Sequence, residues 1–216
     1  MIAVVDYKKG NLKSVERGLI AAGADARIMD DATEIVRADA IVLPGVGAFA
    51  DAAATMNELG QMQVIRDRVR AGVPFLGICL GLHLMYADGV EGAPAGNPAG
   101  GLGLLPGVVE RMPREDSRGH SYKIPHVGWN SIDLTDAGAA SPLFQGIESG
   151  AYFYFTHSYI APRGATELAL TQHSVIFPSA VSFGDRAFGV QFHPEKSSDA
   201  GALVLRNFAR LAEQIR

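Results

Sequence analysis

The chain has 216 residues, of which 48% are hydrophobic and 19% are charged, and its formal net charge is −4. This length and composition suit one α/β domain, residues 1–216. The basic residues are scattered and no apolar run could span a bilayer, so neither nucleic-acid binding nor membrane insertion is indicated. A single cysteine cannot form an internal disulfide, and the start lacks the features of a signal peptide, so we expect a reducing, cytoplasmic location.

The first half of the sequence alternates short apolar runs with amphipathic runs, as a doubly wound sheet does. We expect strands over residues 2–6, 26–29, 40–43 and 73–78, and helices between residues 11 and 23, over 49–59 and over 62–71. The first helix is expected to be capped by Asn11 and to turn Leu12, Val15, Leu19 and Ile20 inward. Short crossovers make neighbouring strands parallel, and ligands bind beyond their carboxyl ends. The pattern therefore predicts an open, mostly parallel sheet with helices on both faces.

The second half begins with residues 88–103, which are rich in Gly, Ala and Pro. This composition predicts a flexible surface loop, and the alternative is a substrate lid. Further strands are expected over residues 108–112, 127–134, 151–160, 167–173, 180–183 and 187–192, and their alternation suggests a mixed or antiparallel region. A last helix is expected to begin near Ser198 and to turn Leu203, Val204, Phe208, Leu211 and Ile215 inward.

Cys79 follows the last strand of the first half, with Gly77 and Gly81 two residues before and after it. A lone cysteine in an apolar run is more often a small buried residue. A continuing strand or helix, however, gains nothing from two glycines. These glycines permit a sharp strand-to-helix turn that holds a nucleophile in a strained, exposed conformation. The pattern predicts a nucleophile elbow with Cys in place of Ser.

The run His193-Pro194-Glu195 follows the last predicted strand. A single histidine at a strand end is usually a hydrogen-bonded surface or core residue. Here Pro194 stops the strand and fixes the backbone between a base and a carboxylate. A thiol nucleophile requires these two partners, so the combination with Cys79 predicts acyl transfer through a thioester.

The elbow and the His-Pro-Glu run together resemble the class I, or triad, glutamine amidotransferases. Four more runs favour one subfamily, the glutaminase subunits of imidazole glycerol phosphate synthases: Asp6-Tyr7-Lys8-Lys9-Gly10-Asn11, Pro44-Gly45-Val46-Gly47-Ala48-Phe49, Ile124-Pro125-His126-Val127-Gly128-Trp129-Asn130 and Phe155-Thr156-His157-Ser158-Tyr159. The similarity extends from Met1 to the final helix.

The resemblance implies a flavodoxin-like class I amidotransferase fold and a heterodimer that needs no metal or cofactor. The chain would hydrolyse L-glutamine to glutamate and ammonia, and the ammonia would pass through a tunnel to a TIM-barrel cyclase subunit. A typical barrel has ~250 residues, so the cyclase must be a separate chain. The implied catalytic triad is Cys79, His193 and Glu195, and the implied oxyanion hole is Val46, Gly47 and Leu80. Substrate contacts would come from Gly45, His83, Ser158 and Tyr159, and partner contacts from Asn11, Arg17, Lys123, Trp129 and Tyr154.

Several alternatives stay open at this stage. His83 occupies a position where relatives commonly have Gln, so it either contacts the substrate or only packs on the elbow helix. Gly45 to Gly47 could form an ordinary turn, and Trp129 and Tyr154 could be core aromatics. The chain could also serve another amidotransferase, which the co-purifying synthase would reveal. A stand-alone Cys-His amidase or peptidase would instead work at full rate without a partner.

Overall fold

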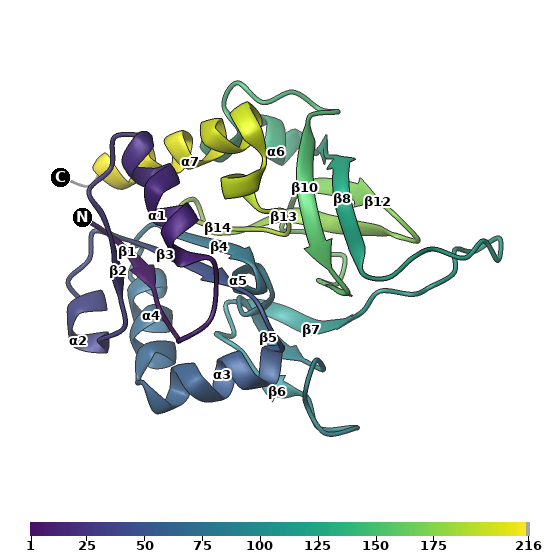
Figure 1. Cartoon of the computed structure of the whole chain (residues 1–216), viewed down its shortest axis with the longest axis horizontal. Coiled ribbons are helices and arrows are strands. Elements are labelled where there is room, and N and C mark those ends of the chain that lie inside the picture. The colour runs from purple at the N-terminus through teal and green to yellow at the C-terminus, as the bar shows by residue number, and fades with distance from the viewer. Residues whose placement is uncertain (215–216) are drawn as a thin grey trace.

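The computed structural model describes residues 1–214 and contains a central sheet of eight strands in the order β2-β1-β3-β4-β14-β13-β12-β9 (Figure 1). These strands are β1 (Ile2–Val5), β2 (Ala26–Met29), β3 (Ala40–Gly45), β4 (Phe75–Cys79), β9 (Asp133–Leu134), β12 (Glu167–Gln172), β13 (Ile176–Phe183) and β14 (Ala187–Val190). The first five in spatial order are parallel, and the other three are antiparallel to their neighbours. The predicted open, mostly parallel sheet is therefore confirmed.

Helices cover both faces of this sheet, as predicted (Figure 1). The helices are α1 (Leu12–Ala21), α2 (Ala32–Ile35), α3 (Phe49–Glu58), α4 (Gln61–Arg70), α5 (Leu80–His83), α6 (Asp136–Ala140) and α7 (Ser198–Glu213), with two 3-10 turns, η1 (Pro142–Phe144) and η2 (Pro194–Lys196). Successive strand residues point to opposite faces. Val4 accordingly packs in the cluster under α1 and α7, whereas Val5 packs in the cluster under α2, α3 and α4.

Two smaller sheets extend the central one. Strand β8 (His126–Ser131) pairs with β10 (Tyr152–His157), and the second sheet has the order β11-β7-β5-β6, formed by β11 (Tyr159–Ile160), β7 (Leu105–Arg111), β5 (Tyr86–Gly89) and β6 (Ala99–Gly100). Strands β5 and β6 lie at the two ends of the segment 88–103, so the prediction of a structureless loop over that whole segment is wrong. Their pairing joins backbone groups of Gly and Ala, which a hydrophobic pattern cannot reveal.

Two details of helix α1 differ from expectation. Ile20 was expected to turn inward but is 53% exposed. The buried residues of α1 are Val15 and Leu19. Asn11 occupies the N-cap position of α1, but its side chain makes no capping hydrogen bond. The predicted inward position of Ile215 lies outside the described residues. Over residues 1–214, no helix is long and apolar enough to cross a membrane.

The strand order decides where the predicted catalytic residues meet. β14 runs parallel to β4 as its direct neighbour, with Val190 opposite Ile78. The carboxyl ends of parallel neighbours lie at the same edge of a sheet. Cys79 and His193, which are far apart in the sequence, therefore follow adjacent strand ends.

Candidate active site

Cys79 occupies a strained turn between β4 and α5. Its φ of 55° and ψ of −104° are sterically costly for a residue with a side chain. A Cβ at Gly77 would lie 2.5 Å from the Gly81 carbonyl oxygen, and a Cβ at Gly81 would lie 1.9 Å from the Leu43 carbonyl oxygen. Glycine is thus required at both positions because backbone occupies the space of a side chain. The strained elbow predicted from the sequence is present, but the predicted exposed position of the nucleophile is wrong, because Cys79 is only 7% exposed and opens to a cavity.

His193 and Glu195 form a buried pair beside the thiol. The Nδ1 of His193 lies 2.9 Å from Oε1 of Glu195, whose side chain is only 2% exposed. The backbone fixes the histidine on both sides, since its N–H donates to the Tyr154 carbonyl and its own carbonyl accepts from the Ser197 hydroxyl. Burial lowers the pKa of His193, but hydrogen bonds with Cys79 and Glu195 outweigh it and raise the pKa to about 10. The pair therefore favours an imidazolium beside the sulfur.

A cavity of about 410 Å³ opens over the thiol. Its walls contain most of the residues predicted for catalysis and substrate binding: Cys79, His193, Val46, Gly47, Leu80, His83, Ser158 and Tyr159. Gly45 lies directly beside them, paired with Cys79 in the ladder between β3 and β4. Glu195 stands behind His193, as a residue that acts through the imidazole would. The structure thus brings together all these predicted residues at one edge of the sheet.

Glu91 also lines this cavity and was not predicted as a site residue. Burial raises the pKa of its carboxyl, and a backbone hydrogen bond at Phe49 opposes that rise in part. In the sequence Glu91 stands in the Gly- and Ala-rich segment 88–103, where a single carboxylate resembles any surface residue. Only the pairing of β5 with β6 and β7 brings it to the cavity.

His83 faces the protein rather than open solvent. It is 3% exposed, and its Nε2 lies 2.7 Å from Oε1 of Gln191, which is itself fully buried. Burial lowers the pKa of His83 to about 4, although hydrogen bonds with Gln191 and with the Tyr159 backbone oppose the shift. His83 is therefore a neutral imidazole at physiological pH.

The segment after β3 can supply a backbone donor to an oxyanion. Val46 is half-exposed at the cavity, and Gly47 has a φ of 100°, a conformation that glycine adopts without strain. Burial raises the pKa of Tyr7, and the Val46 backbone opposes the rise in part. The Val46 backbone thus lies near the Tyr7 hydroxyl, which is buried and has no hydrogen-bond partner among the described residues. Leu80 opens α5 directly after the thiol, so its N–H is the other expected donor.

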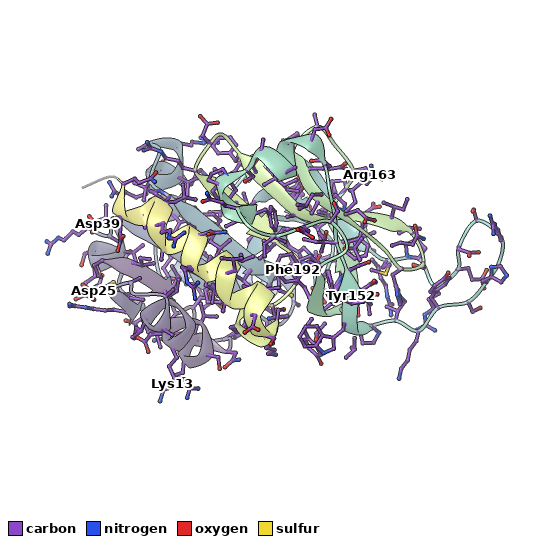
Figure 2. The ribbon with its side chains drawn as sticks, turned by 90° about the horizontal axis from the view of Figure 1, so that it is seen from above. Lys13, Asp25, Asp39, Tyr152, Arg163 and Phe192 are labelled. Atoms are coloured by element: carbon purple, nitrogen blue, oxygen red, sulfur yellow. The ribbon has the colours of Figure 1, made fainter. Side chains whose placement is uncertain are left out.

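The residues predicted for partner contact are spread over several elements. Trp129 on β8 and Tyr154 on β10 meet edge to face at 6.1 Å between ring centroids, and Trp129 is 52% exposed, so it is not a core aromatic. Asn11 and Arg17 are exposed at the start and on the outer side of α1. Lys123 is exposed in the loop between β7 and β8, which projects from the body in both views (Figures 1 and 2).

The sequence did not single out two further apolar side chains on the same small sheet. Val127 is 55% exposed and Tyr152 is 60% exposed. Together with Trp129 they leave a large apolar area of the β8–β10 sheet open to solvent, and such areas mark interaction surfaces. Alternation along a strand would have revealed them only if the buried face of this sheet had been known.

Three buried histidines predict acid sensitivity of the fold. Burial lowers the pKa of His83 and His126 to about 4 and that of His157 well below 6.5. Below pH ~6.5 the unfolded chain therefore binds protons that the folded chain excludes, and the free energy of unfolding falls by about 1.4 kcal/mol per pH unit for a fully buried histidine such as His83. His193 offsets this loss only in part, because its raised pKa adds stabilisation as the pH falls toward 6.5 and adds nothing further at lower pH.

Urea unfolding at pH ~7 and ~5 tests this expectation. The midpoint should fall at the lower pH, and replacing His126 by Gln should weaken the dependence. His120, whose side chain is 70% exposed, offers the matched control, because its replacement by Gln should leave the dependence unchanged. Equal stability of the wild-type chain at both pH values would contradict the assignment of neutral buried histidines.

Comparison with known proteins identifies the family. Residues 3–211 match the family model of class-I glutamine amidotransferases. The chain is 44% identical over 212 residues to the imidazole glycerol phosphate synthase subunit HisH of Moorella thermoacetica, with coverage of 97% of this chain and 94% of the relative. It is 42% identical over 211 residues to the HisH subunit of Syntrophotalea carbinolica, with coverage of 96% and 98%.

Solved structures agree on the fold. A crystal structure of a glutamine amidotransferase has a TM-score of 0.72 at 21% identity and covers 99% of this chain and 100% of its own. The glutaminase domain of Trypanosoma brucei CTPS with bound acivicin has a TM-score of 0.66 at 17% identity, with coverage of 99% and 93%. The chain belongs to the class-I glutamine amidotransferase family and, within it, to the HisH subunits of imidazole glycerol phosphate synthase.

Proposed function

We propose that this chain, acting as one domain over residues 1–216, hydrolyses L-glutamine to glutamate and ammonia and supplies the ammonia to a cyclase subunit. With that ammonia the cyclase makes imidazole glycerol phosphate and aminoimidazole carboxamide ribotide in histidine biosynthesis. The observation that carries the proposal is the position of Cys79 at a strained elbow, inside a cavity and beside the hydrogen-bonded pair of His193 and Glu195. A thiol with a base and an orienting carboxylate is suited to acyl transfer from a carboxamide.

The reaction uses the triad in two stages. His193 holds the proton of Cys79, and the thiolate attacks the carboxamide carbon to form a C–S bond. The tetrahedral intermediate collapses as the C–N bond breaks, and His193 gives its proton to the leaving nitrogen, which departs as ammonia. Water then attacks the thioester while His193 takes its proton, and the C–S bond breaks to return the thiol and release glutamate. Glu195 orients the imidazole through Nδ1 and stabilises its positive charge throughout.

The cavity walls offer groups for the amino-acid end of the substrate. Glu91 provides a carboxylate for the α-ammonium group, and its partly buried position strengthens such a pair relative to bulk water. Ser158 and Tyr159 lie on the wall formed after β10, where they can hold the α-carboxylate. The side-chain amide then points toward Cys79, which is the orientation that hydrolysis requires.

The partner is a TIM-barrel cyclase in a heterodimer, and it docks on the face that carries the exposed aromatics of the β8–β10 sheet. Val127, Trp129 and Tyr152 supply the apolar part of this face. Asn11, Arg17, Lys123 and Tyr154 supply polar contacts around it. Aromatic side chains with a polar rim are typical of stable interfaces. The cavity lies next to this face, because Lys196 lines the cavity and also approaches the Tyr154 ring at 6.0 Å.

Partner-dependent turnover is the expected kinetic consequence. Gly47 has a φ of 100°, so a peptide between Gly45 and Gly47 can turn at little steric cost, and we expect this turn to bring the second donor to the oxyanion. One such donor contributes roughly 10²- to 10³-fold in rate. Adding the cyclase subunit and its ligand should therefore raise kcat by about this factor, with little change in KM, because the missing interaction belongs to the transition state.

Steady-state glutaminase kinetics on the chain alone and with its partner test the proposal. A chain that already works at full rate alone would point to a stand-alone amidase. Activation by a different synthase would assign the chain to another amidotransferase.

A further inference from the structure

Gln191 joins His83 to the sulfur of Cys79 inside the protein. Oε1 of Gln191 lies 2.7 Å from Nε2 of His83, and Nε2 of Gln191 lies 3.7 Å from the Cys79 sulfur, within the range of a hydrogen bond to sulfur. Gln191 is fully buried directly after β14, and His83 ends α5. Two segments distant in sequence, the elbow from Cys79 to His83 and the end of β14, thus place one amide between an imidazole and the thiol.

The orientation of this amide depends on the imidazole. A contact of 2.7 Å between two lone pairs is repulsive, so an amide oxygen at this distance requires the proton on Nε2, in competition with the Tyr159 backbone for the single proton of the neutral ring. His83 then donates to Gln191, and Gln191 donates to the sulfur. If position 83 offered no donor, the amide could rotate by half a turn and present its oxygen to Cys79.

The charge on the sulfur decides which orientation helps catalysis. A thiol could donate its proton to the Thr156 carbonyl, which lies 3.8 Å from the Cys79 sulfur. A thiolate can only accept, and an oxygen facing it is repulsive. The groups that act on the sulfur are the His193 ring, the Gln191 amide, the Thr156 carbonyl and the Tyr7 phenol. Gln191 and His193 are the side chains among them that supply an N–H group.

We propose that His83 is a positioning residue that fixes the Gln191 amide with its N–H group toward Cys79, so that Gln191 stabilises the thiolate. The inference rests on the proposed glutaminase function and assigns to two further residues, His83 and Gln191, a role in stabilising its Cys79 thiolate. His83 borders the cavity, but its Nε2 is engaged by Gln191 and its side chain is almost fully buried, so we assign its contribution to the sulfur. A hydrogen bond to a charged group changes an equilibrium by about tenfold or more.

Alkylation of Cys79 by iodoacetamide tests this effect without requiring glutamine to bind. The rate is measured by intact mass across the neutral pH range for the wild-type chain, His83→Leu, Gln191→Leu and the double variant. Each single variant should react about tenfold more slowly at neutral pH, with its pH profile displaced to higher pH. The double variant should be no slower than Gln191→Leu, because both residues act through one hydrogen bond. His83→Gln keeps a donor and should restore most of the rate.

Thr171→Val provides the control, because Thr171 is buried and polar but donates to the Ser131 carbonyl away from the thiol. It should alkylate at the wild-type rate. The ring ¹⁵N shifts of His83 in the wild-type chain are a second measurement, which needs no variant, and they should report protonation at Nε2.

Three results would overturn the proposal: a wild-type alkylation rate in folded His83→Leu, effects of the two single variants that multiply in the double variant, or protonation of His83 at Nδ1. A raised KM for glutamine with unchanged alkylation would assign His83 to substrate contact instead. Failure of the proposed function is separable, because it would appear as a wild-type complex that alkylates normally yet releases no ammonia from glutamine.

Discussion

Replacing Cys79 by serine should reduce glutamine hydrolysis by at least ~10⁴-fold, because a serine hydroxyl beside His193 is a far weaker nucleophile than a thiolate. The elbow imposes a φ of 55° on this residue whatever its side chain, and serine is close to cysteine in size. Folding and partner binding should therefore be preserved. Ammonia release in the presence of the cyclase measures the loss of activity. Thermal unfolding measures whether the fold is preserved, and co-purification measures whether the partner still binds.

Because Cys79→Ser should keep its fold and its partner, a loss of activity in this variant can be assigned to the missing thiol. A folded, partner-bound Cys79→Ser chain that still hydrolyses glutamine would exclude a thioester mechanism. Gly81→Ala is a useful contrast, since the 1.9 Å approach of a Cβ to the Leu43 carbonyl oxygen should disturb the elbow itself and lower both stability and activity.

Replacing His193 by alanine should have a similarly large effect, roughly 10⁴-fold or more on kcat, because it removes both the base that activates the thiol and the acid that protonates ammonia. Glu195→Gln should lose less. The Nδ1 contact of 2.9 Å can still form with an amide oxygen, which preserves the ring orientation, but the negative charge that stabilises the imidazolium is lost.

Steady-state kinetics of His193→Ala and Glu195→Gln, both measured in the complex, decide whether the Glu195 carboxylate orients the imidazole, stabilises its charge or does both. A wild-type rate in Glu195→Gln would reduce Glu195 to a structural partner of the histidine. An equal, complete loss in both variants would indicate that orientation alone cannot sustain the base.

The sequence predicts the parallel half of the fold well, because its signals are local. Val4 and Val5 alternate between two helical layers, and Gly77 and Gly81 mark the elbow where any Cβ would meet backbone. The strands after residue 105 were also predicted, but their distribution over three sheets was not. Pairings such as β8 with β10 depend on the long-range register that a single sequence does not contain.

In the candidate site, too, the residues marked by local sequence signals could be predicted and those placed by long-range pairing could not. The positions of Cys79 and His193 could be predicted because each follows a strand end with a distinctive motif. Glu91 could not, since only the small sheet of β5, β6 and β7 carries it to the cavity. The link from His83 through Gln191 to the thiol was equally invisible, because it joins the end of a four-residue helix to the residue after β14, and a histidine in an apolar run gives no sign of its partner.

The central claim is that Cys79 attacks glutamine in the cavity beside His193, and covalent labelling tests it most directly. The complex is incubated with a glutamine analogue that carries an electrophile in place of the carboxamide, and the adduct is located by peptide mass mapping. The account predicts one adduct per chain, on Cys79, suppressed by excess L-glutamine and absent from Cys79→Ser. An adduct on another residue, or labelling of Cys79 that glutamine does not suppress, would contradict it.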